Sequence, residues 1–269
     1  MPDDNVIAVK PLSSLAPVSP YVFYLMHEGS GVTLEDSAGQ GPDLTVQGTD
    51  PASSIWANAE WLTLGGDHFA LSGADDVIDA IFRLSDIGDG ALFISYDFYF
   101  DGDVTGGECA FTWGSQGGSY PDDQGYGMNM TSAEGIQFLS RGSNTTNTYN
   151  VPGSDLGSLG STRITCTWEI LGDGTVNFYV NGALLGGVSA AEFDGIQYSN
   201  LDGSPSGLTL FARSNSAGQD RFLSGAGGNA RMARFFACKI PTWQAGDGLA
   251  VNRQMYYGKG ELPRVLAGR

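Results

Sequence analysis

Short runs in which apolar and polar residues alternate dominate the chain. In residues 91–100, one set of alternate positions is entirely apolar, whereas the other set contains Ser95 and Asp97 among aromatic residues. A period of two predicts a β-strand with one face in a core and a mixed opposite face. Similar or fully apolar runs predict strands at 21–26, 44–46, 60–64, 68–71, 109–113, 126–130, 136–140, 163–171, 175–180, 183–186, 208–214 and 230–239.

Turn signals separate these runs. Gly172-Asp173-Gly174 and Asn181-Gly182 lie between alternating segments and predict two successive hairpins. Residues 143–150 are polar and predict a loop or an edge strand. Apolar residues near helical spacing predict a short helix at 75–84, and residues 243–257 predict a short helix or a loop.

The composition supports an all-β fold. The 269 residues include 40 glycines, which suit many short strands joined by tight turns. The chain shows no internal repeat and no linker that would divide it. We therefore expect one two-sheet sandwich at 21–257, a proline-rich extended arm at 1–20, and an extended C-terminal tail at 258–269.

The charge excludes several partners. The formal net charge is −17, and residues 1–140 hold 21 acidic and 2 basic residues, whereas the rest is nearly neutral. Such a surface repels phosphate, so nucleic acid is not an expected partner. No apolar run reaches the roughly 18 residues of a membrane span, so no membrane insertion is expected.

One segment resembles a known fold family. Residues 165–186 resemble the hairpin of concanavalin A-like lectin/glucanase domains of the laminin G-like branch, with Phe178-Tyr179-Val180-Asn181-Gly182 as its second strand and turn. The segments 59–71, 91–100, 208–214 and 230–238 follow the family order, and Tyr256-Tyr257 ends the match. The resemblance covers about residues 21–257 and implies an antiparallel jelly roll of two sheets. This scaffold hosts lectins, enzymes and structural modules, so the resemblance does not decide the function.

Catalytic signatures are weak. Glycoside hydrolysis needs two carboxylates, which one glucanase branch of the family places on a strand as Glu-x-Asp-x-x-Glu or a near variant. The only approach to this motif is Glu192-Phe193-Asp194-Gly195-Ile196-Gln197, which is expected to be a loop and whose last residue cannot be a general acid. Cys166 and Cys238 lie in apolar runs and are expected to be buried hydrophobes. We expect no catalytic residue from these motifs, although a site assembled from distant strands stays open.

The candidate glycan-binding residues are aromatic residues near glycine-rich loops. Sugar rings stack on aromatic faces beside polar donors, and the candidates are Trp113, Tyr120, Tyr126 and Trp56. No cofactor is required, but relatives with this fold bind Ca²⁺ near a glycan site. Oxygen-rich turns would hold that ion, and the candidate ligands are Asp101, Asp103, Asp122 and Asp123.

The sequence is compatible with two functions. The first is a non-catalytic structural or adhesion module, as in a bacteriophage head decoration or tail protein, made in the host cytoplasm. It would be a homo-oligomer that contacts other virion subunits through residues 1–20 and 258–269 and could bind polysaccharide. The alternative is a stand-alone polysaccharide-active hydrolase, lyase or lectin, extracellular by a route without a signal peptide of the usual kind.

Overall fold

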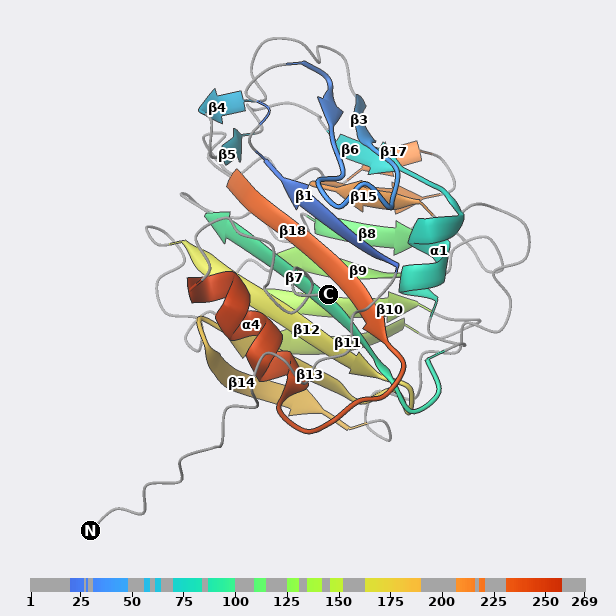
Figure 1. Cartoon of the computed structure of the whole chain (residues 1–269), viewed down its shortest axis with the longest axis vertical. Coiled ribbons are helices and arrows are strands. Elements are labelled where there is room, and N and C mark those ends of the chain that lie inside the picture. The colour runs from blue at the N-terminus through green and yellow to red at the C-terminus, as the bar shows by residue number, and fades with distance from the viewer. Residues whose placement is uncertain are drawn as a thin grey trace.

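Two packed β-sheets form the body of the protein (Figure 1). The computed structural model describes residues 20–26, 28, 31–47, 56–58, 61–63, 70–83, 87–99, 109–114, 125–130, 135–141, 146–151, 163–189, 207–215, 218–220 and 231–257. The expected arm and tail therefore lie outside the described residues, apart from Pro20.

Sheet A lies in front in Figure 1 and has the order β14-β13-β12-β7-β18-β5-β4, with β1 also paired to β18. All its pairings are antiparallel. Its strands are β1 (Tyr21–Leu25), β4 (Trp56–Asn58), β5 (Trp61–Thr63), β7 (Ala91–Tyr99), β12 (Ile164–Leu171), β13 (Val176–Val180), β14 (Ala183–Val188) and β18 (Arg231–Ile240).

Sheet B lies behind and has the antiparallel order β11-β10-β9-β8-β15-β6-β3-β2. Its strands are β2 (Thr33–Leu34), β3 (Leu44–Gln47), β6 (Ala70–Gly73), β8 (Cys109–Gly114), β9 (Gly125–Met130), β10 (Ile136–Arg141), β11 (Thr146–Val151) and β15 (Leu208–Leu210). A separate two-stranded sheet contains β16 (Arg213–Asn215) and β17 (Gly218–Asp220). The expected all-β sandwich is confirmed.

Two helices lie within the described residues. Helix α1 (Asp76–Phe82) begins after Asp75, whose side chain accepts a hydrogen bond from the Ile78 N–H at 2.8 Å and so caps the helix. It directs Ile78, Ile81 and Phe82 into the core. Helix α4 (Asp247–Tyr257) lies across the outer face of sheet A (Figure 1). No helix in the described ranges is long and apolar enough to cross a membrane.

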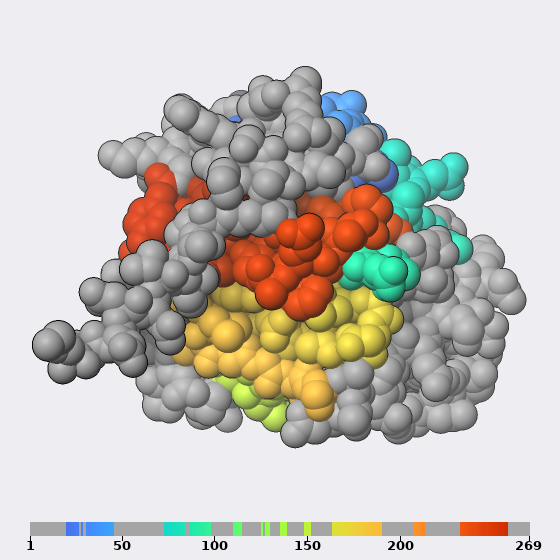
Figure 2. Space-filling view, turned by 60° about the horizontal axis from the view of Figure 1, so that its bottom comes forward, coloured from blue at the N-terminus to red at the C-terminus, as the bar shows by residue number. Residues whose placement is uncertain are grey.

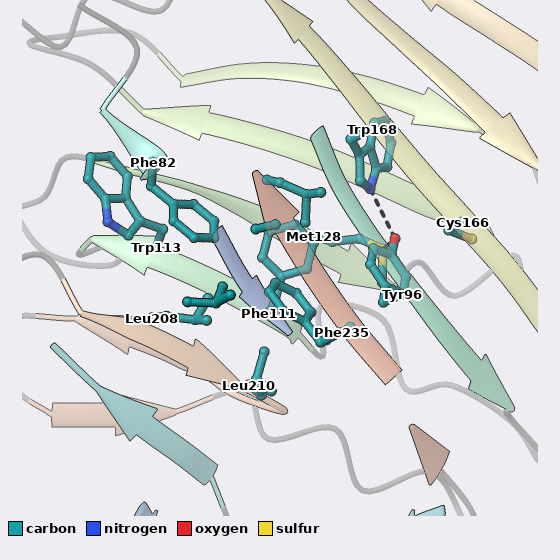
Figure 3. Close-up of a cluster of buried hydrophobic side chains, with 14 of the residues drawn as sticks. Phe82, Tyr96, Phe111, Trp113, Met128, Cys166, Trp168, Leu208, Leu210 and Phe235 are labelled. Atoms are coloured by element: carbon teal, nitrogen blue, oxygen red, sulfur yellow. Dashed lines mark hydrogen bonds between the residues drawn. The ribbon is translucent and has the colours of Figure 1, made fainter. Parts of the chain in front are cut away.

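Aromatic side chains fill the space between the sheets (Figure 3). The Trp168 ring of β12 packs on Phe178 and Phe138, with centroid distances of 4.0 and 4.8 Å. Its indole N–H donates to the Tyr96 hydroxyl at 3.0 Å, and that hydroxyl donates to the Met128 sulfur. Each such buried ring stabilises the fold by roughly 1.5–3 kcal/mol, and the hydrogen bonds keep its polar atoms satisfied.

The hairpin that carried the family resemblance forms as expected. Asn181 and Gly182 have φ values of 48° and 88°, which produce the two-residue turn between β13 and β14. The polar run 143–150 contributes an edge strand, β11, rather than a loop. The run 208–214 divides into β15 and β16, because Phe211 adopts a positive φ of 66° that ends the first strand.

Gly90 provides a test of the packing between β7 and β18. A Cβ atom on Gly90 would lie 1.9 Å from the carbonyl oxygen of Ile240, where the two strands begin to pair. We expect Gly90→Ala to lower the free energy of unfolding by about 3 kcal/mol or more, because backbone must move.

Gly88→Ala is the matched control for that measurement by urea denaturation. Gly88 has a φ of +55° but no heavy atom within 4 Å of an added Cβ. It should cost only the left-handed backbone penalty, about 1 kcal/mol. Equal losses for the two variants would contradict the close approach at Gly90.

Candidate functional site

The mixed face predicted for residues 91–100 is the face that α4 covers. Its apolar members join residues of β1, β18 and α4 in a second hydrophobic cluster outside sheet A. Next to this cluster lies a group of buried polar and charged side chains on sheet A, which we call the helix seat. The helix seat consists of Ser95, Asp97, Thr165, Thr167, Glu169 and Arg234.

Glu169 holds the N-terminal end of α4. One carboxylate oxygen accepts hydrogen bonds from the Gly248 N–H and the Trp243 indole N–H, both at 2.8 Å. The other accepts from the Asn177 amide at 2.7 Å and the Tyr179 hydroxyl at 2.9 Å. A carboxylate at this end of a helix also complements the helix dipole, so the charge is both bonded and electrostatically stabilised.

Asp97 and Arg234 hold the C-terminal end of α4. Arg234 donates from Nε to Asp97 and from Nη2 to the Met255 carbonyl oxygen of the last helical turn. Asp97 also accepts from the Thr165 hydroxyl and from Arg163, each at 2.5 Å. A cation at the C-terminal end matches the dipole, and its carboxylate partner neutralises it inside the protein.

Asn252 connects the middle of α4 to the sheet. Its Nδ2 group donates to the Thr167 hydroxyl at 2.9 Å and to the Thr165 carbonyl at 3.1 Å. Its Oδ1 accepts the Gly182 N–H at 2.6 Å, at the turn between β13 and β14. The helix is therefore bonded to the sheet at both ends and at its centre.

The chemistry of these groups is structural. Four carboxylates are buried among the described residues, and each accepts hydrogen bonds from neighbouring backbone or side chains: Asp36, Asp97, Glu169 and Asp247. A general acid needs a carboxyl group that meets substrate in a cleft. These four face protein donors instead.

The buried thiols are equally unsuited to nucleophilic chemistry. Cys166 and Cys238 are free and buried, and burial raises both pKa values above the ordinary 9.0. They stay protonated at neutral pH, whereas the thiolate is the nucleophile. The expectation that they are buried hydrophobes agrees with their position. The Cys109 side chain and residues 192–197 lie outside the described residues.

Trp113 requires a correction. It was expected beside a glycine-rich loop as a sugar platform, but its side chain is fully buried between the sheets. Its ring stacks on Phe82 with centroids 6.1 Å apart and planes 18° apart (Figure 3). The pairing of Trp113 with Leu208 across β8 and β15 explains this, because that register directs both side chains inward.

The other predicted site residues are not brought together by described contacts. Trp56 lies in β4 and Tyr126 in β9, but their side chains lie outside the described set, as does all of Tyr120. The candidate calcium ligands Asp101, Asp103, Asp122 and Asp123 also lie outside it. Among the described residues, no group of three or more His, Cys, Asp or Glu side chains could hold a metal.

Sequence reasoning missed an exposed aromatic surface at the end of α4. Tyr256 and Tyr257 are 41% and 69% exposed, and their rings meet edge to face with centroids 4.8 Å apart. Arg253 Nε donates to the Gly182 carbonyl oxygen at 3.0 Å. We call Asn181, Gly182, Arg253, Tyr256 and Tyr257 the tyrosine patch. Two adjacent aromatics on a polar helix were the available signal.

The geometry of the tyrosine patch is fixed by the hairpin. A Cβ atom on Gly182 would lie 3.5 Å from both the Tyr257 hydroxyl and the Arg253 side chain. Asn181 accepts the Thr165 N–H on its side-chain oxygen at 2.9 Å, which anchors the turn to β12. Two aromatic rings and a guanidinium of α4 thus meet the amide of the turn, and together these groups can stack on and hydrogen-bond a polar ligand.

Comparison with known proteins identifies the fold. No family model and no curated protein matches the chain. The binding domain of botulinum neurotoxin serotype D aligns with 12% identity and a TM-score of 0.55, over 88% of this chain and 51% of that one. The binding domain of neurotoxin DC, in complex with rat synaptotagmin II, aligns with 13% identity and a TM-score of 0.52, over 86% and 53%.

The chain thus spans about half the length of the solved structures that it matches. A botulinum neurotoxin type C structure, whose cell entry is described as dependent upon interaction with two ganglioside molecules, aligns at 12% identity and a TM-score of 0.52, over 88% and 52%. At such identities the likeness shows a shared all-β sandwich fold.

Glu169→Gln tests the helix seat. An amide offers one acceptor oxygen where four donors converge, so at least one pair of donors loses its partner. We expect a loss of about 2–4 kcal/mol in the free energy of unfolding. Asp173→Asn is the matched control, since Asp173 accepts the Thr175 N–H in an exposed turn, and it should cost less than about 1 kcal/mol.

Alkaline pH should destabilise the protein. Burial, followed by the nearby Glu169 charge, raises the pKa of Tyr179 above the ordinary 10.0, and burial raises that of Tyr96 likewise. Below these ordinary values the groups are neutral in both states, so their contribution is fully present. As pH rises further, only the unfolded chain releases protons, so the free energy of unfolding falls.

Urea denaturation at a series of pH values from about 8 to 12 measures this slope, which is close to zero below about pH 9 and approaches about 1.4 kcal/mol per pH unit for each such group above about pH 10. Tyr179→Phe should reduce the slope, because it removes one titrating group. A free energy of unfolding that does not change across this range would contradict the prediction.

Proposed function

We propose that this chain is a non-catalytic recognition module that binds carbohydrate on a cell surface. One observation supports this most directly: the buried carboxylates of the described residues are consumed in holding α4 and the turns, as Glu169 shows with its four donors. Carboxylates that are bonded in this way stabilise the fold and are not available to contact a ligand. We therefore expect exposed side chains to bind the ligand.

The tyrosine patch is the proposed contact surface. The C–H face of a pyranose ring packs on an exposed aromatic ring, and Tyr257 is the most exposed large hydrophobic side chain among the described residues. Arg253 of α4 is bonded to the turn that holds Asn181, and both side chains carry N–H donors for sugar hydroxyls. Helix α4 and the hairpin position these groups before the ligand arrives, which lowers the entropic cost of binding.

The fold is compatible with this role. A neurotoxin DC binding domain of the same fold is described in complex with SialylT, and cell entry of neurotoxin type C is described as dependent upon interaction with two ganglioside molecules. Those ligands belong to those proteins, and the low identity transfers only the scaffold. The likeness nevertheless supports the proposal, because it places the chain on a scaffold found in receptor-binding domains.

The finer proposal is that the module belongs to a bacteriophage virion, on a head or a tail. Residues 1–20 contain four prolines and suit an extended arm that joins a neighbouring subunit, and residues 258–269 suit a second such segment. Immunogold labelling of intact particles with an antibody against this chain tests it. Label on the particle surface is expected, and its absence from particles that contain the chain would reject a surface position.

A calcium ion is a further part of the proposal. In the sequence, Asp101 and Asp103 precede β8, and Asp122 and Asp123 follow it, so each pair is proposed as a candidate site of its own. Isothermal titration with CaCl₂, and with MgCl₂ as control, tests each pair through Asp→Asn variants. Heat that is unchanged in both double variants would exclude these ligands.

Tyr257→Ala tests the glycan proposal. Removing the ring should weaken binding to a carbohydrate identified on a glycan array by about tenfold or more, whereas Tyr257→Phe should stay within about threefold. Isothermal titration measures both, and circular dichroism verifies the fold. No binding by the wild-type chain across the array would reject carbohydrate recognition, and turnover of a polysaccharide would favour the enzyme alternative.

A further inference from the structure

Strand β14 forms one end of sheet A, and within the described strands it pairs with β13 alone. Its outward edge presents backbone N–H and C=O groups that can pair with another strand. Proteins usually guard such an edge with lysine, proline or another charge. β14 reads Ala-Leu-Leu-Gly-Gly-Val and has none of these, and no charged residue lies between Asp173 and Glu192. Leu184 is 58% exposed on this strand.

The bulge in β14 is explained by contacts with the core. Phe178 pairs with Gly186 and Tyr179 with Leu184, so Leu185 is the extra residue. Leu185 packs against the main core, and Gly186 closes on sheet B, where a Cβ atom would lie 2.4 Å from the Tyr149 hydroxyl oxygen. The bulge thus explains how the two sheets meet at this end of the sandwich, and it does not introduce a charge or proline at the edge.

The neighbouring edge of sheet B, formed by β11, also lacks charged residues. β11 is the end strand of that sheet, and no charged residue lies between Arg141 and Asp155. In Figure 2 the orange surface of β13 and β14 lies open beside red α4, with a yellow-green part of sheet B beneath it. The far end of sheet B differs, because the two-residue strand β2 is followed at once by the exposed carboxylate of Glu35.

A second copy of this chain is the partner that fits β14. Two copies with a net charge of −17 repel each other over most approaches, so a stable contact requires an uncharged surface. Two identical strands related by a two-fold axis pair antiparallel and satisfy each other's backbone groups. We propose that the protein forms a two-fold homodimer in which β14 pairs with β14 of the second copy and extends sheet A across the interface.

The test is the mass of the full chain in solution. Multi-angle light scattering and sedimentation over roughly 1–200 µM should show a species of twice 28.3 kDa. Leu184→Lys should weaken association by at least about tenfold, because it places a charged side chain on the shared edge in each copy. Raising the salt from about 0.02 to 0.5 M should strengthen the wild-type dimer by screening its net charge.

Val32→Lys is the matched control. Val32 is 39% exposed beside β2, so the same apolar-to-lysine change falls at the other end of sheet B, and dimerisation should be unchanged. Ala183→Lys, also at an exposed β14 position, repeats the test should Leu184→Lys fail to fold by circular dichroism.

Hydrogen exchange places the contact. The amides of residues 183–188 should gain protection as the concentration rises. A wild-type chain that stays monomeric at the highest concentration would overturn the proposal. So would a dimer that survives both lysine variants without added protection in β14. The test measures mass and exchange alone, so its outcome is independent of the carbohydrate proposal.

Discussion

The pairing of buried charges with the two ends of α4 is the constraint on which the rest of the structure depends. Glu169 meets the N-terminal end of the helix, and Arg234 with Asp97 meets the C-terminal end. Buried charges of this kind are costly unless each one is fully bonded. The outer face of sheet A is therefore complete only with α4 in place, and the helix in turn fixes the hairpin at Gly182. The tyrosine patch owes its rigidity to this chain of bonds.

Local patterns predicted the strands well because the alternation of residues 91–100 is a property of the strand itself. This alternation was enough to distinguish the core positions of the strand from the mixed face that carries Ser95 and Asp97. The dipeptide Asn181-Gly182 was likewise enough to predict its turn. The partners of that mixed face were beyond prediction, since they come from α4 and β18. Trp113 was placed in a loop environment because glycine follows it, whereas its neighbours across the sheet set its direction.

The candidate binding surface shows the same limit. The pair Tyr256-Tyr257 is visible in the sequence, but its position beside Gly182 is not, because the hairpin and α4 meet only in the folded protein. The loops that drew attention for their glycines and aspartates are separate from this surface in the chain. About half of each neurotoxin binding domain has the same fold as this chain, although only 12–13% of the aligned residues are identical. Very different side chains can therefore form this fold.

The bonds that join α4 to β12 connect residues that are far apart in the chain: Asn252 and Thr167 are 85 positions apart, and Gly248 and Glu169 are 79 apart. Contacts of such long separation form late, because loop closure must precede them. Strands β7, β12 and β18 must assemble first, and until then Asp97, Glu169 and Arg234 remain hydrated at little cost. Docking of α4 then removes water from all three at once. We therefore expect α4 to dock last when the protein folds and to leave first when it unfolds.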